Sequence, residues 1–374
     1  MDLASTLAPI CTQAVSRQVT PGGVIAVATA DSAIGTFTFG TTASLNEGGV
    51  KVTGKTIYDL ASLTKPMATV ALTMRSVSNG MLDISKRVCE LVPWLDRSIA
   101  RRIEVRHLLG HAAGLPAHVP FYQHLLSSGS SRPRRTQLLA LAKEVEIESS
   151  PGSRVVYSDV GYIILGALLE RIWDRPLDEL FATEIADRGG LDTTTYSIAK
   201  RVVPNAANIA PTEQAPDLDG RRLCGIVHDE NARAGQAPLG HAGLFGTALD
   251  VLRFAMQLNH AVRGEDNRIF DPQVARHFVS AQAAPRTTWR LGWDTPSPPP
   301  AKSHAGDLWT PSGFGHLGFT GTSLWLDPER GRAVVILTNR VYYSRAPEPI
   351  RDFRRAIMDT ISRHLDRSSH IDQG

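Results

Sequence analysis

The stretch Tyr58-Asp59-Leu60-Ala61-Ser62-Leu63-Thr64-Lys65-Pro66 lies where a strand-like run of residues gives way to a helix. Ser62 and Lys65 are three residues apart, so on a helix their side chains project from the same side, one turn apart. A serine hydroxyl beside a lysine amine is the pairing that an activated serine nucleophile needs. Pro66 fits the first turn of a helix, where its missing N–H has no partner to lose. This stretch predicts a nucleophilic Ser62 assisted by Lys65, with a helix-capping serine and a solvated lysine as the alternative.

A second segment, Tyr157-Ser158-Asp159, precedes a long apolar run that predicts a helix over Val160–Trp173. A phenol close to a lysine ammonium gives up its proton more easily and can shuttle a proton between nucleophile and leaving group. The alternative interpretation is a half-buried Tyr157 and an Asp159 that caps the helix.

The third segment, His316-Leu317-Gly318, is predicted to lie on an edge strand. Its glycine allows the backbone to approach a ligand closely. An N–H group of this strand, together with the N–H of Ser62, could face the negative oxygen that develops when a carbonyl is attacked.

The rest of the chain shows strands near both ends and helices between them. The hydrophobic pattern predicts a first helix through Leu3 and Val15, strands at Gly23–Ala30 and Gly35–Thr41 joined around Asp31-Ser32, and a helix over Pro66–Asn79. Later strands are predicted at Arg290–Asp294, Thr322–Leu326 and Ala333–Asn339, followed by a closing helix over Glu348–Leu365. We therefore expect a sheet region formed by residues 1–60 and 285–374, and a mainly helical region formed by residues 61–284 within a single catalytic unit.

In this order and spacing, the three segments resemble those of the serine β-lactamase and penicillin-binding protein superfamily. The similarity is greatest to its class C-like branch of esterases and D-amino-acid peptidases, and it spans nearly the whole chain. The resemblance implies an α/β, β-lactamase/transpeptidase-like fold: an antiparallel sheet built from both chain ends and flanked by helices, with an inserted, mostly helical region.

The resemblance also implies a chemistry. Ser62 would attack an ester or amide carbonyl and form an acyl-enzyme, with Lys65 and Tyr157 accepting its proton. The backbone N–H groups of Ser62 and Phe319 would hold the oxyanion, and water would release the acyl group. The substrate side of the site would contain Asp159, His316, Gly318 and Phe319, and neither a metal nor an organic cofactor is expected.

Three positions, in two of the segments, depart from the usual pattern of the superfamily. Asp159 stands where an asparagine is usual, and a carboxylate near Lys65 favours the charged lysine, so Tyr157 becomes the stronger candidate for the base. His316 and Leu317 stand where lysine and threonine or serine usually hold a substrate carboxylate, and leucine cannot form that hydrogen bond. The changes at His316 and Leu317 argue against efficient β-lactam hydrolysis.

Composition excludes several other classes of protein. The 374 residues are 42% hydrophobic and 21% charged, which is typical of a globular enzyme, and the net charge of +3 is scattered, so nucleic acid is not an expected partner. Three widely separated cysteines suggest neither a disulfide framework nor a thiolate metal site. Without a signal peptide pattern or a run of 18 apolar residues, we expect a cytoplasmic protein that does not enter a membrane. The sequence leaves the oligomeric state open.

The leading functional hypothesis is an esterase for small esters. The alternatives are a hydrolase of peptidoglycan fragments, either a D-amino-acid peptidase or a muropeptide amidase, and a weak β-lactamase; in each case we expect substrate selectivity to come from loops such as Pro116–Arg135 and His228–Gly243. A non-catalytic penicillin-binding sensor is a further alternative. The last is a nucleotide-binding enzyme, because Gly49–Thr56 matches the phosphate-loop pattern GxxxxGK[ST], although the residues around it look extended.

Overall fold

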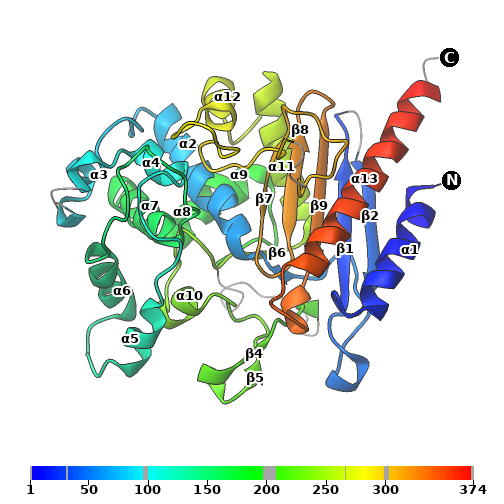
Figure 1. Cartoon of the computed structure of the whole chain (residues 1–374), viewed down its shortest axis with the longest axis horizontal. Coiled ribbons are helices and arrows are strands. Elements are labelled where there is room, and N and C mark those ends of the chain that lie inside the picture. Colours follow the sequence, from blue (N-terminus) through cyan, green and yellow to red (C-terminus); the bar gives the residue numbers. More distant parts are fainter. Residues whose placement is uncertain are drawn as a thin grey trace.

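Five strands form one antiparallel sheet in the order β2-β1-β9-β8-β7 (Figure 1). The computed structural model describes residues 2–30, 33–95, 100–196, 208–265, 267–298 and 303–371. The strands are β1 (Gly22–Ala28), β2 (Ala33–Gly40), β7 (Phe314–Leu317), β8 (Ser323–Asp327) and β9 (Arg332–Thr338). Because β1 pairs with β9, the two ends of the chain meet in the middle of the sheet, as the sequence predicts. The predicted turn at Asp31-Ser32 lies outside the described residues.

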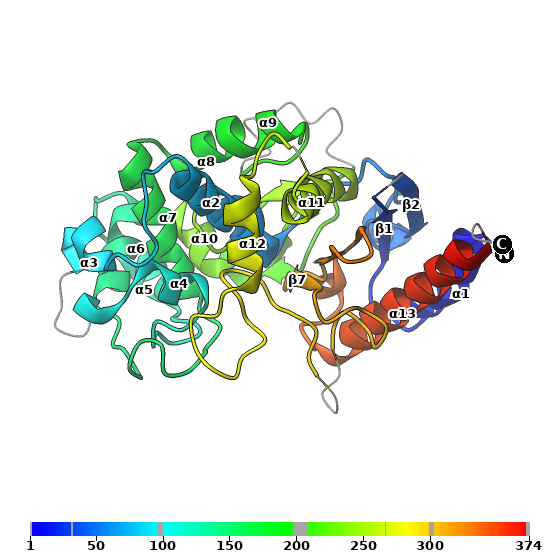
Figure 2. The ribbon, with the colours of Figure 1, turned by 90° about the horizontal axis from the view of Figure 1, so that it is seen from above.

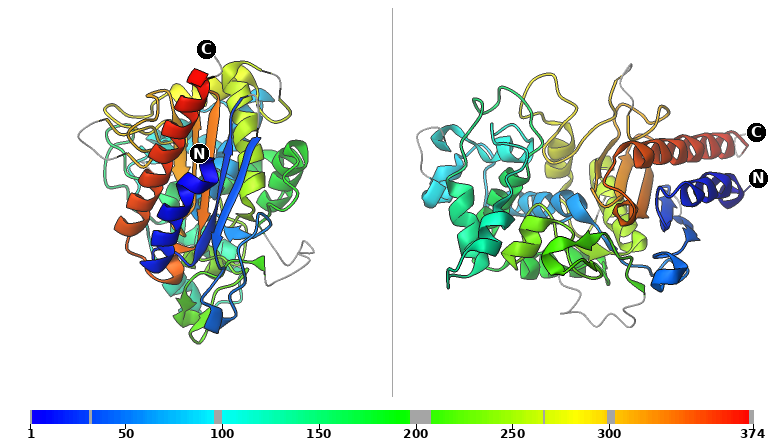
Figure 3. Two further views of the ribbon diagram at one scale, coloured as in Figure 1. Left: turned by 90° about the vertical axis from the view of Figure 1, so that its right-hand side faces the viewer. Right: turned by 60° about the horizontal axis from the view of Figure 1, so that its bottom comes forward.

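Both faces of the sheet are covered by helices, which explains why β1 is apolar throughout. Ile25 and Val27 face a core shared with α1 (Leu3–Ser16) and α13 (Glu348–Ile371), whereas Val24 and Ala26 face the larger core of the molecule. Figure 2 shows α1 and α13 side by side on the outer face, and the left view in Figure 3 shows them in front of the strands. A strand buried on both faces needs no polar alternation.

The helical region also contributes to the sheet's packing. Its helix α11 (Ala248–Arg263) contacts β1, β8 and β9 on the face opposite α13. The predicted division of the chain at residues 60/61 and 284/285 stays a prediction. Residues from both regions belong to one continuous hydrophobic core.

Residues 58–65, the nucleophile segment predicted from the sequence, lead into the helices of the middle region. The predicted helix Pro66–Asn79 is confirmed as η3 (Lys65–Val70, a π-helix) continued by α2 (Ala71–Ser78), and it ends where Gly80 has a φ of +70°. The other α-helices are α3 (Val88–Leu91), α4 (Val105–Leu109), α5 (Phe121–Ser127), α6 (Arg134–Lys143), α7 (Asp159–Trp173), α8 (Leu177–Leu180), α9 (Asp187–Gly189), α10 (Glu230–Gly235) and α12 (Pro272–Ser280).

Short elements complete the described chain. A second π-helix, η6 (Phe181–Ala186), joins α8 to α9. Two-residue strands pair as β3 (Tyr58–Asp59) with β6 (Phe245–Gly246) and as β4 (Gln214–Ala215) with β5 (Arg221–Arg222). The 3₁₀ turns are η1 (Leu45–Glu47), η2 (Ala61–Leu63), η4 (Pro93–Leu95), η5 (Ala100–Arg102), η9 (Pro216–Leu218) and η10 (Arg340–Tyr342). Among the described residues, no helix combines the length and the apolar character needed to cross a membrane.

The predicted strand over Arg290–Asp294 is wrong. The backbone turns at Gly292, which has a φ of +92°, and the Arg290 N–H bonds to the carbonyl of Trp293. Only Asp294 pairs with the sheet, through an isolated bridge to Gly315 on β7. The apolar residues of this segment are buried in the core, but they lie in a turn. A short run of apolar residues looks the same in the sequence whether it forms a buried turn or a buried strand.

The segment that matches the phosphate-loop pattern lacks the geometry of such a loop. No helix begins at Lys55 in the described stretch 33–95; the chain continues into β3 instead. Lys51 pairs with Thr41, and a side chain at Gly49 would lie 2.0 Å from the carbonyl oxygen of Ala43, so the loop is packed against its neighbour. Phosphate binding needs N–H groups aimed at a free space in front of a helix, and this segment offers none.

Candidate active site

Ser62 lies on the short turn η2, between strand β3 and helix η3. The residue before it, Ala61, has a φ of +47°, a region that residues with a Cβ rarely adopt. The Asp59 carboxylate holds this conformation by accepting a hydrogen bond of 2.8 Å from the Ala61 N–H. Such strain is found where the surrounding structure fixes a functional group, and here it sets the direction of the partly exposed Ser62 side chain.

Lys65 lies one turn further along, fully buried. Its Nζ donates to Ser62 Oγ at 3.0 Å, to Asp159 Oδ1 at 2.7 Å and to the carbonyl of His241 at 3.1 Å. An ammonium group has three N–H donors, so all three are used. The structure therefore brings Ser62 and Lys65 together as predicted, and adds Asp159 as the partner of the lysine.

The charges of Lys65 and Asp159 support each other. Burial lowers the pKa of Lys65, but the Asp159 carboxylate outweighs this and raises the pKa above its usual value. Burial likewise raises the pKa of Asp159, but the Lys65 charge and a hydrogen bond from His118 hold it well below its usual range. Near neutral pH the two groups form an ion pair, and Lys65 has no free lone pair with which to take a proton from Ser62.

Tyr157 stands beside this ion pair, with Lys65 Nζ 4.8 Å from the centre of its ring. Its ring packs against His111 at 4.4 Å, between ring centroids, and against His316 at 5.9 Å. Burial raises the pKa of Tyr157, and the Lys65 charge offsets only part of that rise. The cap of α7 is Ser158, whose side chain accepts from the Gly161 N–H, so Asp159 is not the capping residue and is left to pair with Lys65.

His316 lies on β7, the edge strand, and is 1% exposed. Its Nδ1 is 2.8 Å from the carbonyl oxygen of Leu317, so this nitrogen must carry a proton. Burial, reinforced by the nearby Lys65 charge, lowers the pKa of His316 to about 3. The imidazole is therefore neutral and does not replace the lysine that the superfamily usually carries here.

The turn after β7 is bonded to the nucleophile segment. The Thr320 hydroxyl donates to the carbonyl of Asp59 at 2.8 Å, and the Thr322 hydroxyl donates to the carbonyl of Leu60 at 3.0 Å. A side chain at Gly318 would lie 2.0 Å from Thr322 Oγ1 and 2.7 Å from the Leu60 carbonyl oxygen, so glycine is required at this position. This close approach holds the turn that contains Gly318 and Phe319 next to the segment that contains Ser62.

A cavity of about 570 Å³ opens in front of Ser62. It is lined by the predicted site residues Ser62, Tyr157, Asp159, His316, Gly318 and Phe319. The buried Lys65 is not part of the lining and contacts the cavity residues Ser62 and Asp159. The two loops expected to control selectivity each reach it, one through His118 and the other through His228–Glu230 and Ala242. Sequence reasoning missed further lining residues, which belong to no motif: Trp289, Asp294, His304, Arg340, Arg345 and Arg354.

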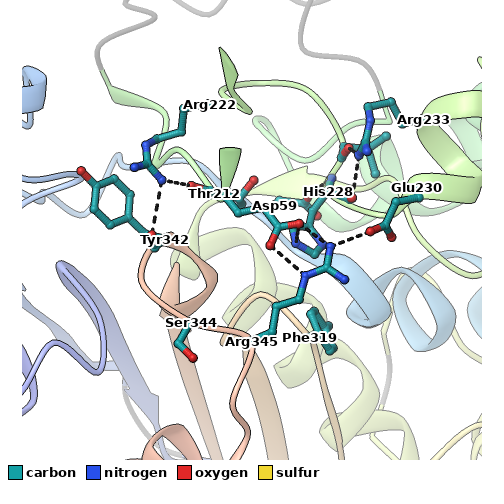
Figure 4. A network of polar contacts seen from close by, with 12 residues as sticks. Asp59, Thr212, Arg222, His228, Glu230, Arg233, Phe319, Tyr342, Ser344 and Arg345 are labelled. Carbon is teal, nitrogen blue, oxygen red and sulfur yellow. Dashed lines mark hydrogen bonds and ion pairs between the residues drawn. The ribbon is translucent and has the colours of Figure 1, made fainter. Parts of the chain in front are cut away.

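A network of ion pairs forms one rim of the cavity (Figure 4). Arg345 binds Glu213 and Glu230, and His228 Nε2 lies 3.0 Å from Glu213 Oε1. The backbone N–H of His228 donates at 2.7 Å to Asp59, the carboxylate that also holds Ala61. The rim and the nucleophile segment are thus joined through Asp59, a buried acid that the sequence did not single out.

Known proteins resemble this chain in sequence and in fold. The family model described as Beta-lactamase matches residues 7–357. A Salmonella typhimurium (strain LT2) protein named "Putative D-alanyl-D-alanine carboxypeptidase" is 31% identical over 310 residues, which cover 78% of this chain and 71% of that protein.

Solved structures agree with the sequence match. EstCE1, described as a hydrolase with promiscuous acyltransferase activity, is 26% identical with a TM-score of 0.73, covering 95% of this chain and 98% of that one. The fold is shared by a class C β-lactamase from Rhodobacter sphaeroides, which is 18% identical with a TM-score of 0.71 and covers 96% of this chain and 99% of its own. The predicted β-lactamase/transpeptidase-like fold is confirmed, and this chain belongs to the Beta-lactamase family of serine hydrolases.

Proposed function

We propose that this protein hydrolyses small esters through an acyl-enzyme formed on Ser62. The observation that carries the proposal is the 3.0 Å contact between Lys65 Nζ and Ser62 Oγ at the floor of an open cavity. The positive φ of Ala61, directly before Ser62, supports the proposal, because backbone strain of this kind is concentrated at active sites.

Tyr157 is the proposed base, because the ion pair with Asp159 occupies Lys65. The Ser62 proton passes to the Tyr157 phenolate, whose charge the Lys65 ammonium stabilises, as Ser62 Oγ bonds to the ester carbon. Tyr157 then returns the proton to the leaving alcohol as the carbon–oxygen bond breaks. Water, deprotonated by the same phenolate, releases the acid and restores Ser62.

The oxyanion formed in each step is assigned to the backbone N–H groups of Ser62 and Phe319. Their segments are fixed relative to each other by the Thr320 and Thr322 hydrogen bonds to Asp59 and Leu60. Donors that are already in place stabilise the developing charge without reorganisation, which is usually the largest single contribution to such catalysis.

The wall at His316 favours esters over substrates that carry a carboxylate. A neutral histidine followed by Leu317 offers no cation and no hydroxyl to a carboxylate at this position. EstCE1 is described as a hydrolase with acyltransferase activity, which agrees with the proposed acyl-enzyme. The carboxypeptidase name of the Salmonella relatives supports the second candidate, hydrolysis of D-amino-acid peptides from peptidoglycan, and a weak β-lactamase activity is the third. The cytoplasmic location remains part of the proposal, and cell fractionation tests it.

Mass spectrometry of the intact protein after treatment with a fluorophosphonate probe tests the proposal. One adduct is expected on the wild type and none on Ser62→Ala. Turnover of p-nitrophenyl butyrate should fall by about 10²- to 10⁴-fold in Tyr157→Phe, with Tyr122→Phe, a tyrosine outside the cavity, as the matched control. An adduct that persists in Ser62→Ala would overturn the proposal, and a wild type that binds the probe without turnover of esters, peptides or β-lactams would favour the sensor alternative.

A further inference from the structure

The turn Gly318–Thr322 is held from behind by an arginine of the last helix. Arg354, on α13, donates from Nη2 to the carbonyl oxygen of Gly318 at 3.0 Å and to that of Thr322 at 2.7 Å. The arginine is 4% exposed and belongs to the cavity wall. No motif marks it, because it lies 36 residues beyond Gly318 in a helix whose other face is solvated.

Among the described residues, Arg354 has no acidic partner. The acidic groups Asp307, Asp352 and Asp366 pair with other arginines. The Nε of Arg354 is buried without a hydrogen-bond partner. A buried arginine is normally paired with a carboxylate, because an uncompensated charge is costly in a low-dielectric interior. Its positive field reaches the cavity: burial and then the Arg354 charge lower the pKa of His304, another lining residue, to about 4.

The carbonyl of Gly318 and the N–H of Phe319 belong to the same peptide group. That planar group is conjugated, so a cation bonded to its oxygen draws electron density from its nitrogen and makes the N–H a stronger donor. The Phe319 N–H is the donor to which the proposed function assigns the oxyanion. Arg340 binds the other side of this residue, donating from Nε to the Phe319 carbonyl at 2.9 Å, and keeps the peptide in place.

We infer that Arg354 is a positioning residue of the oxyanion site: through the Gly318–Phe319 peptide, its unpaired charge strengthens the N–H donor that stabilises the transition state. The inference rests on the proposed function of Ser62. It assigns a catalytic reason to a buried charge that the fold itself does not neutralise. The contribution arises mainly when negative charge develops on the substrate, so it should appear in kcat and not in KM.

Two substitutions separate charge from packing. Arg354→Gln keeps an N–H donor and removes the charge, whereas Arg354→Lys keeps both the charge and a donor. With p-nitrophenyl butyrate we expect kcat to fall about tenfold in Arg354→Gln at unchanged KM, and to stay within about threefold of the wild type in Arg354→Lys. Phenylboronic acid, which becomes a tetrahedral anion on Ser62, should lose affinity in Arg354→Gln by the same factor as kcat. Arg363→Gln, on an exposed part of α13, is the matched control.

A second pair of variants neutralises the charge without changing Arg354. Ile350 lies one turn earlier on α13 and lines the cavity. Ile350→Glu should lower kcat and boronate affinity relative to Ile350→Gln, its neutral counterpart. This comparison still tests the inference if Arg354→Gln does not fold. An equal loss of kcat in Arg354→Gln and Arg354→Lys, or an unchanged boronate affinity in Arg354→Gln, would overturn the inference. The proposed function would still stand as long as the probe labels Ser62. If the probe does not label Ser62 and Ser62→Ala still turns over the ester, the proposed function itself would be wrong.

Discussion

Asp159 Oδ1 lies 2.7 Å from Lys65 Nζ, which also donates a hydrogen bond of 3.0 Å to Ser62 Oγ. The superfamily resemblance implies an asparagine at this position, and this chain has a carboxylate instead. It changes the proton chemistry of the site, because a carboxylate keeps the lysine charged where an amide would not.

Replacing Asp159 with asparagine should move the pH dependence of catalysis. The Asp159 charge raises the pKa of both Lys65 and Tyr157, so its removal lowers both. If the Tyr157 phenolate is the base, kcat/KM of the wild type rises into the alkaline range, and in Asp159→Asn that rise begins at lower pH, with about 3- to 10-fold higher activity near pH 8. Stopped assays from pH 6 to 11 measure kcat/KM of the wild type and of Asp159→Asn. A uniform loss of activity at every pH would contradict this and identify Asp159 as a proton acceptor acting through Lys65.

The same ion pair predicts how stability depends on pH. The pKa of Asp159 is lower in the folded protein than its usual 3.8, so its stabilisation is present above that pH and is lost as the pH falls. The pKa of Lys65 is higher than its usual 10.5, so its stabilisation is lost only as the pH rises beyond that value. Urea unfolding should show Asp159→Asn about 2 kcal/mol less stable at pH 7, with the difference shrinking below about pH 4. Asp192→Asn, at an 81% exposed side chain, should show no such difference.

Gly318 should tolerate no side chain. A Cβ at this position would lie 2.0 Å from Thr322 Oγ1, which would push the turn after β7 away from Leu60 and misplace the Phe319 N–H. We expect Gly318→Ala to lower kcat by about 10²-fold, the size of effect seen when an oxyanion donor is lost. The matched control is Gly54→Ala, where the nearest atom, Thr36 Oγ1, is 3.6 Å away. Full activity in Gly318→Ala would show that this turn does not carry the oxyanion donor.

His316 should set the preference between esters and β-lactams. Because the wild-type imidazole is neutral, kcat/KM for p-nitrophenyl butyrate should exceed that for nitrocefin, which carries a carboxylate. His316→Lys adds a cation at the position where the superfamily usually has one, and it should raise the nitrocefin-to-ester ratio by about tenfold, the size of one charge-assisted hydrogen bond. His124→Phe, an exposed histidine outside the cavity, is the control for general effects. A ratio unchanged by His316→Lys would move carboxylate recognition elsewhere in the cavity.

Patterns in the sequence predicted the sheet and much of the site for local reasons. The helix after Ser62, the helix α7 and the strands β1, β8 and β9 follow from the spacing of apolar residues, because burial requires that spacing. Arg290–Asp294 failed for the same reason: its apolar residues are buried, but in a turn around Gly292.

What the sequence by itself determined is the pairing of Ser62 with Lys65, since residues three apart in a helical segment lie on the same side of it. Only the tertiary structure decided which of these side chains are charged. The charge of Lys65 depends on Asp159, 94 residues away, and the support of the Phe319 peptide depends on Arg354 from the last helix. A pKa depends on burial and on distances through space, and these are set only when remote parts of the chain pack around one cavity.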